Sequence, residues 1–212
     1  MSISLSLYDI FSITVPGLIY LFAINELLRA FSKPYVDILQ ISTSGQILLL
    51  VLAAFVLGHL FNPFTYDRWY RLFVKTYEDK MVLERINSRF PELKLKFKPT
   101  DSEILFAVIQ SRNKGLADRI ETHRANAIMM RNISFGLFLI GLVELTYFIM
   151  SNYAISFLAT TILCFIFSRV AIGSARRFYE WFYRDVFRIS SVYGNTCQAV
   201  IKQFRTEVVL RS

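Results

Sequence analysis

Residues 133–150 read ISFGLFLIGLVELTYFIM, and this stretch decides the fold. It is apolar or small almost throughout, and its length is close to the roughly 20 residues with which a helix crosses a hydrocarbon core. Glu144 lies inside it. An ionised carboxylate at that depth costs on the order of 3 kcal/mol or more, so such residues usually face a bundle interior, a partner or water. We therefore expect a membrane-spanning helix, with Glu144 as the leading candidate for a functional residue.

The overall composition favours the same class of protein. Of the 212 residues, 54% are hydrophobic and only 19% are charged, a balance typical of integral membrane proteins. The two cysteines, Cys164 and Cys197, are too few and too differently placed for a disulfide framework or a metal cluster. The N-terminus, MSISLSLYDI, has no Lys or Arg, so we expect no cleaved signal peptide.

We predict an all-α polytopic helical membrane protein with about four transmembrane helices. Pro16 frees a backbone carbonyl that a neighbouring helix or water must satisfy, which implies a packed bundle. The segment around Pro16 is either a kinked span or a tilted, half-embedded helix, and Asn62-Pro63 is expected to kink or stop the second span. The four segments are Ile10–Leu28, Gln46–Phe64, Ile133–Met150 and Tyr153–Gly173.

Basic residues are concentrated in two segments. Residues 66–131 hold 14 Lys and Arg against 9 Asp and Glu, and residues 167–212 hold 8 against 3. The positive-inside rule places both segments in the cytoplasm. We therefore expect a multi-pass inner-membrane protein with both termini cytoplasmic. Its predicted parts are a membrane helical pair (1–65), a cytoplasmic helical region (66–131), a membrane helical hairpin (132–174) and a cytoplasmic amphipathic tail (175–212).

The cytoplasmic region should be mostly helical. Hydrophobic residues at helical spacing predict one helix over Tyr66–Arg89. The alternating LKLKFK of residues 93–98 predicts a short strand or an extended link. A second helix is expected near Pro99, with Thr100 and Glu103 at capping-box spacing. It should break near Asn113–Gly115, and a third helix then runs without a breaker into the third span.

The C-terminal tail carries many aromatic residues, six of the ten from Phe178 to Phe187. Aromatic rings interleaved with arginines suit the headgroup layer of a membrane. We expect a helix that continues from the fourth span and ends at Gly194-Asn195, followed by a short amphipathic helix over Thr196–Leu210. The predicted membrane-interface residues are Arg176, Arg177, Trp181 and Arg184.

Two carboxylates lie in the outer half of the predicted spans. At 1.5 Å per residue, Glu144 is about 18 Å along the third span and Glu26 about 24 Å along the first. One interpretation is a cation or proton path, or a pore lined by acidic rings in an oligomer. The other interpretation is that the carboxyl group of Glu144 forms a hydrogen bond to a neighbouring helix or stays protonated and uncharged. For Glu26, beside Arg29, an interfacial position is favoured.

His59 and Arg169 are polar residues near the inner ends of their spans, where they can reach Asn132 or backbone carbonyls. Snorkelling towards the headgroups is the simpler account of Arg169. A proton relay is an alternative for His59, but a packed interfacial histidine is favoured.

Arg119 and His123 stand four residues apart on one helix face. The pair resembles the Arg-to-His signature of HEPN ribonucleases, although the spacing is at least one residue short. A membrane-tethered ribonuclease using these two residues is therefore the catalytic alternative. No CxxC, HExxH, GxSxG or phosphate-binding glycine loop occurs, so we expect no cofactor and no metal. Acids among the basic residues argue against direct nucleic-acid binding and favour a membrane-adjacent face.

Two stretches, LYDIFSITVPGLIYLFAINELL (residues 7–28) and HRANAIMMRNISFGLFLIGL (residues 123–142), carry a family resemblance. They are similar to small bacterial multi-pass membrane proteins of antiviral defence loci, and nearest to the four-span accessory proteins encoded beside type VI CRISPR effectors. The resemblance covers the span layout and these stretches only. It implies a bacterial inner-membrane partner of an RNA-guided nuclease.

The favoured hypothesis is a non-enzymatic membrane effector or accessory protein that forms a homo-oligomer. Its spans would form or gate a pore, or perturb the bilayer. We expect an oligomer because four helices in one subunit are few for a conduit. Besides the ribonuclease, the other hypothesis is a scaffold that anchors a soluble nuclease through the basic cytoplasmic helices.

Overall fold

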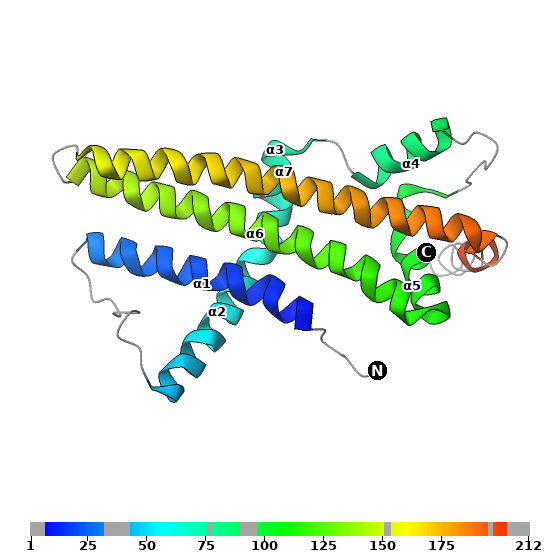
Figure 1. Ribbon diagram of the computed structural model, residues 1–212, viewed down its shortest axis with the longest axis horizontal. Coiled ribbons are helices and arrows are strands. Elements are labelled where there is room, and N and C mark those ends of the chain that lie inside the picture. The colour runs from blue at the N-terminus through cyan, green and yellow to red at the C-terminus, as the bar shows by residue number, and fades with distance from the viewer. Residues whose placement is uncertain are drawn as a thin grey trace, which may run out of the picture. The chain divides into compact units, whose positions relative to one another are not determined.

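The computed structural model describes residues 7–31, 43–75, 78–89, 97–150, 154–194 and 197–202, with side chains from Ile10 onward. Within these ranges every regular element is a helix, so the predicted all-α class is confirmed. The elements are α1 (Leu7–Ala30), α2 (Ser44–Phe64), the π-helical η2 (Thr65–Tyr70), α3 (Arg71–Phe73), α4 (Glu78–Arg89), the 3₁₀ turn η4 (Pro99–Asp101), α5 (Ser102–Arg112), α6 (Lys114–Met150) and α7 (Ile155–Val192) (Figure 1).

Among the residues that the structure describes, four helices are long and apolar enough to cross a membrane. They cover Ile10–Ala30, Ser44–Phe73, Lys114–Met150 and Ile155–Val192. The four-span prediction is therefore confirmed in length and composition, and the chain is a polytopic helical membrane protein.

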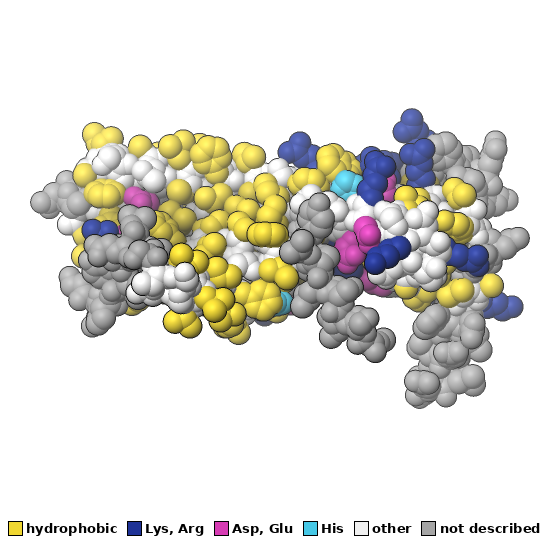
Figure 2. Space-filling model, turned by 60° about the horizontal axis from the view of Figure 1, so that its bottom comes forward, with side chains coloured by type: hydrophobic (Ala, Val, Ile, Leu, Met, Phe, Trp, Pro, Cys, Tyr) yellow, Lys and Arg dark blue, Asp and Glu magenta, His cyan; other side chains and the backbone are white. Residues whose placement is uncertain are grey.

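The chain forms two compact units. The first, called the membrane unit here, comprises Met1–Phe73 and Ala125–Ala175, and the second, called the helical unit, comprises Val74–Arg124 and Arg176–Ser212. Figure 2 shows that the two differ in surface chemistry. Apolar side chains spread over the visible face of the membrane unit, whereas Lys and Arg side chains gather on the helical unit. α2 contributes much of the exposed apolar surface, through residues such as Leu49 and Leu60.

In the membrane unit, α1 and α2 touch backbone to backbone. A Cβ atom at Gly17 would lie 1.8 Å from the carbonyl oxygen of Ala54, and one at Gly58 would lie 2.2 Å from the carbonyl oxygen of Ile13. No side chain fits at either position. Small residues at such crossings let membrane helices approach closely and gain van der Waals contact, which is the main attraction available in lipid.

An aromatic cluster around Phe135 of α6 fills the space between these helices. The Phe135 ring lies 5.8 Å from Tyr20 of α1, 5.7 Å from Phe61 of α2 and 5.5 Å from Trp69 of η2, measured between ring centroids. The pairs are tilted or edge-on, the geometries that aromatic quadrupoles favour. One phenyl ring on α6 thus contacts side chains from three other elements.

The helical unit has its own apolar core. Leu105 and Ile109 of α5, Ile120 of α6 and Phe187 of α7 are almost completely buried there, and Val82 of α4 joins them. Residues 197–202 are helical and add Cys197 and Ile201 to this core. α5 ends at Arg112 and α6 begins at Lys114, so the predicted break near Asn113–Gly115 is confirmed, as is the helix that runs unbroken into the third span.

Of the two outcomes expected at Asn62-Pro63, a stop is excluded, because the helix continues as η2 and α3 to Phe73. Two other local predictions were wrong. The single helix expected over Tyr66–Arg89 is interrupted after Phe73, since Val74 and Lys75 are not helical. Thr100 and Glu103 do not form the cap before α5. Instead the Lys98 backbone N–H donates to the Asp101 carboxylate at 2.7 Å, because Pro99 has already set the first turn.

Two other predictions fall outside the described residues: the strand or link at residues 93–96, and the last helix beyond residue 202. Gly194 at the end of the α7 region has φ +27°, a left-handed conformation that glycine adopts without strain.

Candidate functional site

A polar cluster lies inside the membrane unit around Arg131 of α6, which is only 3% exposed. Its Nη2 donates hydrogen bonds to the side-chain oxygen of Asn62 and, at 3.4 Å, to the Asn62 backbone carbonyl. The guanidinium also lies over the Tyr66 ring, 5.2 Å from its centroid. The charge pattern predicts a basic residue in the segment beside the span. The structure shows that this side chain is buried, because Asn62 and Tyr66 supply acceptors and an aromatic face.

Asn132, the next residue, is fully buried and connects three helical elements. Its Nδ2 donates to Asn62 Oδ1 at 3.2 Å, and its Oδ1 accepts a short hydrogen bond from the Thr65 hydroxyl. The backbone carbonyl of Asn132 accepts from the Tyr20 hydroxyl of α1 at 2.8 Å. Every polar atom named here has a partner, which is what a buried polar network needs in order to stabilise a bundle.

A second polar contact joins α6 to α7. The Ser134 hydroxyl donates to the Ser168 carbonyl oxygen, and the Ser168 hydroxyl donates to the Ser134 carbonyl oxygen, both at 2.8 Å. The indole Nε1–H of Trp69 donates to Ser134 Oγ at 3.1 Å. Trp69 comes from η2, and π-helical turns occur frequently at functional sites. Sequence reasoning missed these contacts, although Asn62, Thr65 and Asn132 already stood as polar residues at the ends of apolar runs.

The two intramembrane carboxylates are close in space. Glu26 of α1 and Glu144 of α6 are near enough for their charges to interact. Glu26 has partners: the Tyr147 hydroxyl donates to its backbone carbonyl at 3.1 Å, and the Arg29 guanidinium lies 3.8 Å from its carboxylate. Glu144 is half-buried and makes no hydrogen bond or ion pair among the residues that the structure describes. A carboxylate of this kind can hold a cation, line a water path or contact another chain.

His59 and Arg169 lie apart from the polar cluster, on exposed faces of α2 and α7. The His59 ring packs edge-on against Phe55 with centroids 4.5 Å apart, and the Arg169 guanidinium lies 5.5 Å from the centroid of Phe73. Asn132 contacts Asn62, Thr65 and Tyr20 instead.

The proposed ribonuclease pair lies in the helical unit. His123 Nε2 is 3.6 Å from the Asp185 carboxylate of α7, and its ring is 5.7 Å from Trp181. Arg119 is exposed. Among the described residues, no group of three His, Cys, Asp or Glu side chains forms a potential metal site.

The predicted interface residues of α7 make contacts within the helical unit. Arg176 pairs with Glu180 at 3.2 Å and donates to the Met81 sulfur at 3.5 Å, and Arg184 pairs with Asp185 at 3.3 Å. Trp181 packs edge-on against Phe178, and Arg177 is exposed.

Comparison with known proteins gives no relative: no protein family, no curated protein and no solved structure matches the chain.

Proposed function

We propose that the protein is a non-enzymatic inner-membrane effector whose spans, in an oligomer, form or gate a cation path at Glu144. The observation that supports this is the half-buried Glu144 carboxylate in a spanning helix, which has no partner in the described part of its own chain. Glu26 adds a second negative charge in range. Two carboxylates in a low-dielectric region repel each other, and a bound cation or an ordered water column offsets that cost.

Self-association is part of the proposal because a path needs walls. One chain supplies four spanning helices, and the outer face of α2 is apolar over most of its length. Leu48, Leu52 and Val56 lie on that face and are each more than half exposed. Such a surface can face either lipid or a second copy of α2.

Ion flux in reconstituted vesicles tests the cation path. Purified protein in liposomes should dissipate a potassium diffusion potential, and Glu144→Gln should reduce the rate about tenfold or more because the side chain keeps its shape and loses its charge. Glu84→Gln is the matched control, since Glu84 is an exposed acid of α4. Unchanged flux in Glu144→Gln, or no flux in the wild-type protein, would rule the path out.

We further propose a bacterial inner membrane as the location, with both termini in the cytoplasm. The concentration of arginine and lysine outside the spans supports this orientation. The resemblance to accessory proteins of RNA-guided nucleases suggests a role in antiviral defence beside such a partner. Reporter fusions at each terminus test the orientation: a cytoplasm-active reporter should work at both ends, and a periplasm-active one at neither.

A scaffold that anchors a soluble nuclease is the second candidate. The compact core of the helical unit supports it, because a separately packed unit can present a docking surface. If a partner still co-purifies with the Glu144→Gln protein, the scaffold is favoured over the cation path. The ribonuclease is the weaker alternative, because His123 pairs with Asp185. RNA cleavage by the purified protein that is lost in His123→Ala would be needed to support this hypothesis.

A further inference from the structure

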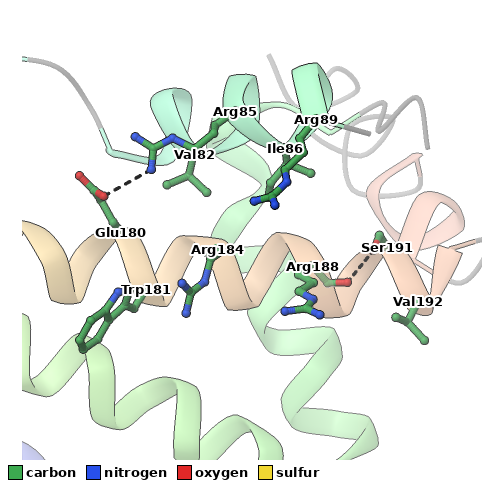
Figure 3. Close-up of a pocket in the computed structure, with 10 residues that line it drawn as sticks. All are labelled: Val82, Arg85, Ile86, Arg89, Glu180, Trp181, Arg184, Arg188, Ser191 and Val192. Carbon is green, nitrogen blue, oxygen red and sulfur yellow. Dashed lines mark hydrogen bonds and ion pairs between the residues drawn. The ribbon is translucent and has the colours of Figure 1, made fainter. Parts of the chain in front are cut away.

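A groove between α4 and α7 of the helical unit is lined by arginines from both helices. Its volume is about 590 Å³, within the range of small-molecule sites. Figure 3 shows Arg89 reaching from α4 towards α7, while the side chains of Arg184 and Arg188 extend from α7 on the side away from α4 in this view. The lining includes Arg85, Arg89, Arg184, Arg188, Trp181 and Val82.

The spacing of these arginines concentrates positive charge. Arg85 and Arg89 are four residues apart on α4, and Arg184 and Arg188 are four residues apart on α7. Like charges at this spacing share a helix face and destabilise the helix slightly. Here two such pairs line one groove, so the repulsion within each helix is added to repulsion across the groove.

The nearby acids neutralise only part of this charge, because two carboxylates, Glu180 and Asp185, pair with two of the four arginines that line the groove. Glu180 lies 3.7 Å from Arg85 and 3.2 Å from Arg176. Asp185 lies 3.3 Å from Arg184 and 3.6 Å from His123.

Arg188 is the arginine of the groove with the least local compensation. Its backbone carbonyl accepts from Ser191, but its guanidinium has no hydrogen bond or ion pair with any side chain that the structure describes. The groove therefore carries more positive charge than its own residues balance.

We propose that this groove binds a small phosphate-bearing ligand. Guanidinium groups bind phosphate oxygens in pairs of hydrogen bonds, so Arg184 and Arg188 would hold the phosphate. Val82 and the 39% exposed Trp181 would contact an apolar or aromatic body. A free nucleotide and a phospholipid headgroup share this chemistry. The site does not depend on the cation path, since all its residues belong to the helical unit.

Tryptophan fluorescence gives a direct readout, because the chain has only two tryptophans. In a Trp69→Phe background, Trp181 becomes the single reporter, and it lines the groove. Titration of detergent-purified full-length protein with ATP, and separately with inorganic pyrophosphate, should change its emission saturably.

Three substitutions in the groove and one control outside it distinguish a specific binding site from nonspecific attraction to a basic protein. Arg188→Gln and Arg184→Gln should each weaken binding about tenfold or more, the usual worth of a charge-assisted hydrogen bond. Glu180→Gln should tighten binding several-fold, since it removes the negative charge that competes for Arg85. Arg112→Gln, an exposed arginine outside the groove, is the control and should leave binding unchanged.

A second arm identifies the source of the phosphate. The same protein is placed in phosphatidylcholine nanodiscs with or without phosphatidylglycerol, and the Trp181 emission and melting temperature are compared. A response to ATP or pyrophosphate identifies a soluble ligand, and a response only to phosphatidylglycerol identifies a headgroup. No response to any of these probes, or equal losses in Arg188→Gln and Arg112→Gln, would overturn the proposal.

Discussion

The guanidinium of Arg131 and the side-chain oxygen of Asn62 form a hydrogen bond between α6 and α2, inside the membrane unit. Asn62 serves as acceptor for two donors, because the amide of Asn132 also donates to its Oδ1. Asn62→Ala should therefore destabilise the protein by about 2 to 4 kcal/mol, since it deprives a buried charge of an acceptor. Unfolding in a mixed detergent titration measures the loss. Arg169→Ala is the control and should change the unfolding free energy by less than about 1 kcal/mol, since Arg169 is exposed. Equal effects of the two substitutions would contradict this account of the polar cluster.

The crossing of α1 and α2 predicts a sharp difference between two glycines. Gly17→Ala should prevent close packing, because the new Cβ would lie 1.8 Å from the Ala54 carbonyl oxygen. We expect a loss of at least about 3 kcal/mol, or no folded protein. Gly173→Ala in α7 meets no atom within 4 Å and should stabilise the helix by about 0.5 to 1 kcal/mol. Melting temperatures in detergent give the comparison, and a Gly17→Ala protein as stable as wild type would show that the helices do not touch there.

Trp69→Phe should be tolerated. The substitution removes the hydrogen bond from Nε1 to Ser134, but Ser134 keeps its reciprocal bonds with Ser168. A phenyl ring can still pack against Phe135 and Phe138, so the expected cost is about 1 to 2 kcal/mol. Circular dichroism melting measures it. A loss as large as that of Asn62→Ala would mean that the indole N–H matters more than its single bond suggests.

Cys197 should resist alkylation in the folded protein. It is fully buried, and burial raises the pKa of its thiol, against smaller lowering effects of the nearby Ser190 and Arg112. In a Cys164→Ala background, iodoacetamide should label Cys197 only after the helical unit opens, because the thiolate is the reactive form. Rapid labelling of the folded protein at neutral pH would contradict the burial of this residue.

The same thiol makes stability fall at alkaline pH. In the unfolded chain a cysteine ionises near pH 8.5, whereas in the folded chain the raised pKa keeps the proton on Cys197. Above that pH the unfolded state holds fewer protons than the folded state, so the free energy of unfolding decreases as pH rises. Cys197→Ala should remove this part of the decline, measured by detergent titration between neutral pH and pH 10.

Much of the fold follows from hydropathy. The four spans, the break at Asn113 and the helix from Lys114 into the third span are visible in the sequence because apolar runs and helix breakers are local signals. The course of the second span after Pro63 is not visible in the sequence. The composition of η2 does not distinguish it from an α-helix, and the difference lies in the tertiary packing of Trp69 and Tyr70. The cap before α5 was also missed, because Lys98 contributes only its backbone there.

For the candidate site, the sequence identified single residues but not their partners. Glu144 stood out by its depth in an apolar run, and Glu26 by the same argument, but nothing local shows that they approach each other. The sequence shows Arg131 only as the last residue of a basic segment, and the packing of α6 against α2 reveals its buried amide partner. Helix-to-helix contacts of this kind depend on the rotation of each helix about its axis, which periodicity fixes poorly in a uniformly apolar span.

The π-helical turn at Thr65–Tyr70 has a consequence for sequence length. A π-turn holds one more residue than an α-turn. If the same residues wound as an ordinary α-helix, with none deleted, every later residue of that helix would turn by about 100° about the axis. Trp69 would turn away from Ser134, and the contact that joins η2 to the pair of serines would be lost. The count of residues in this turn, rather than their identity alone, sets which side chains meet inside the bundle.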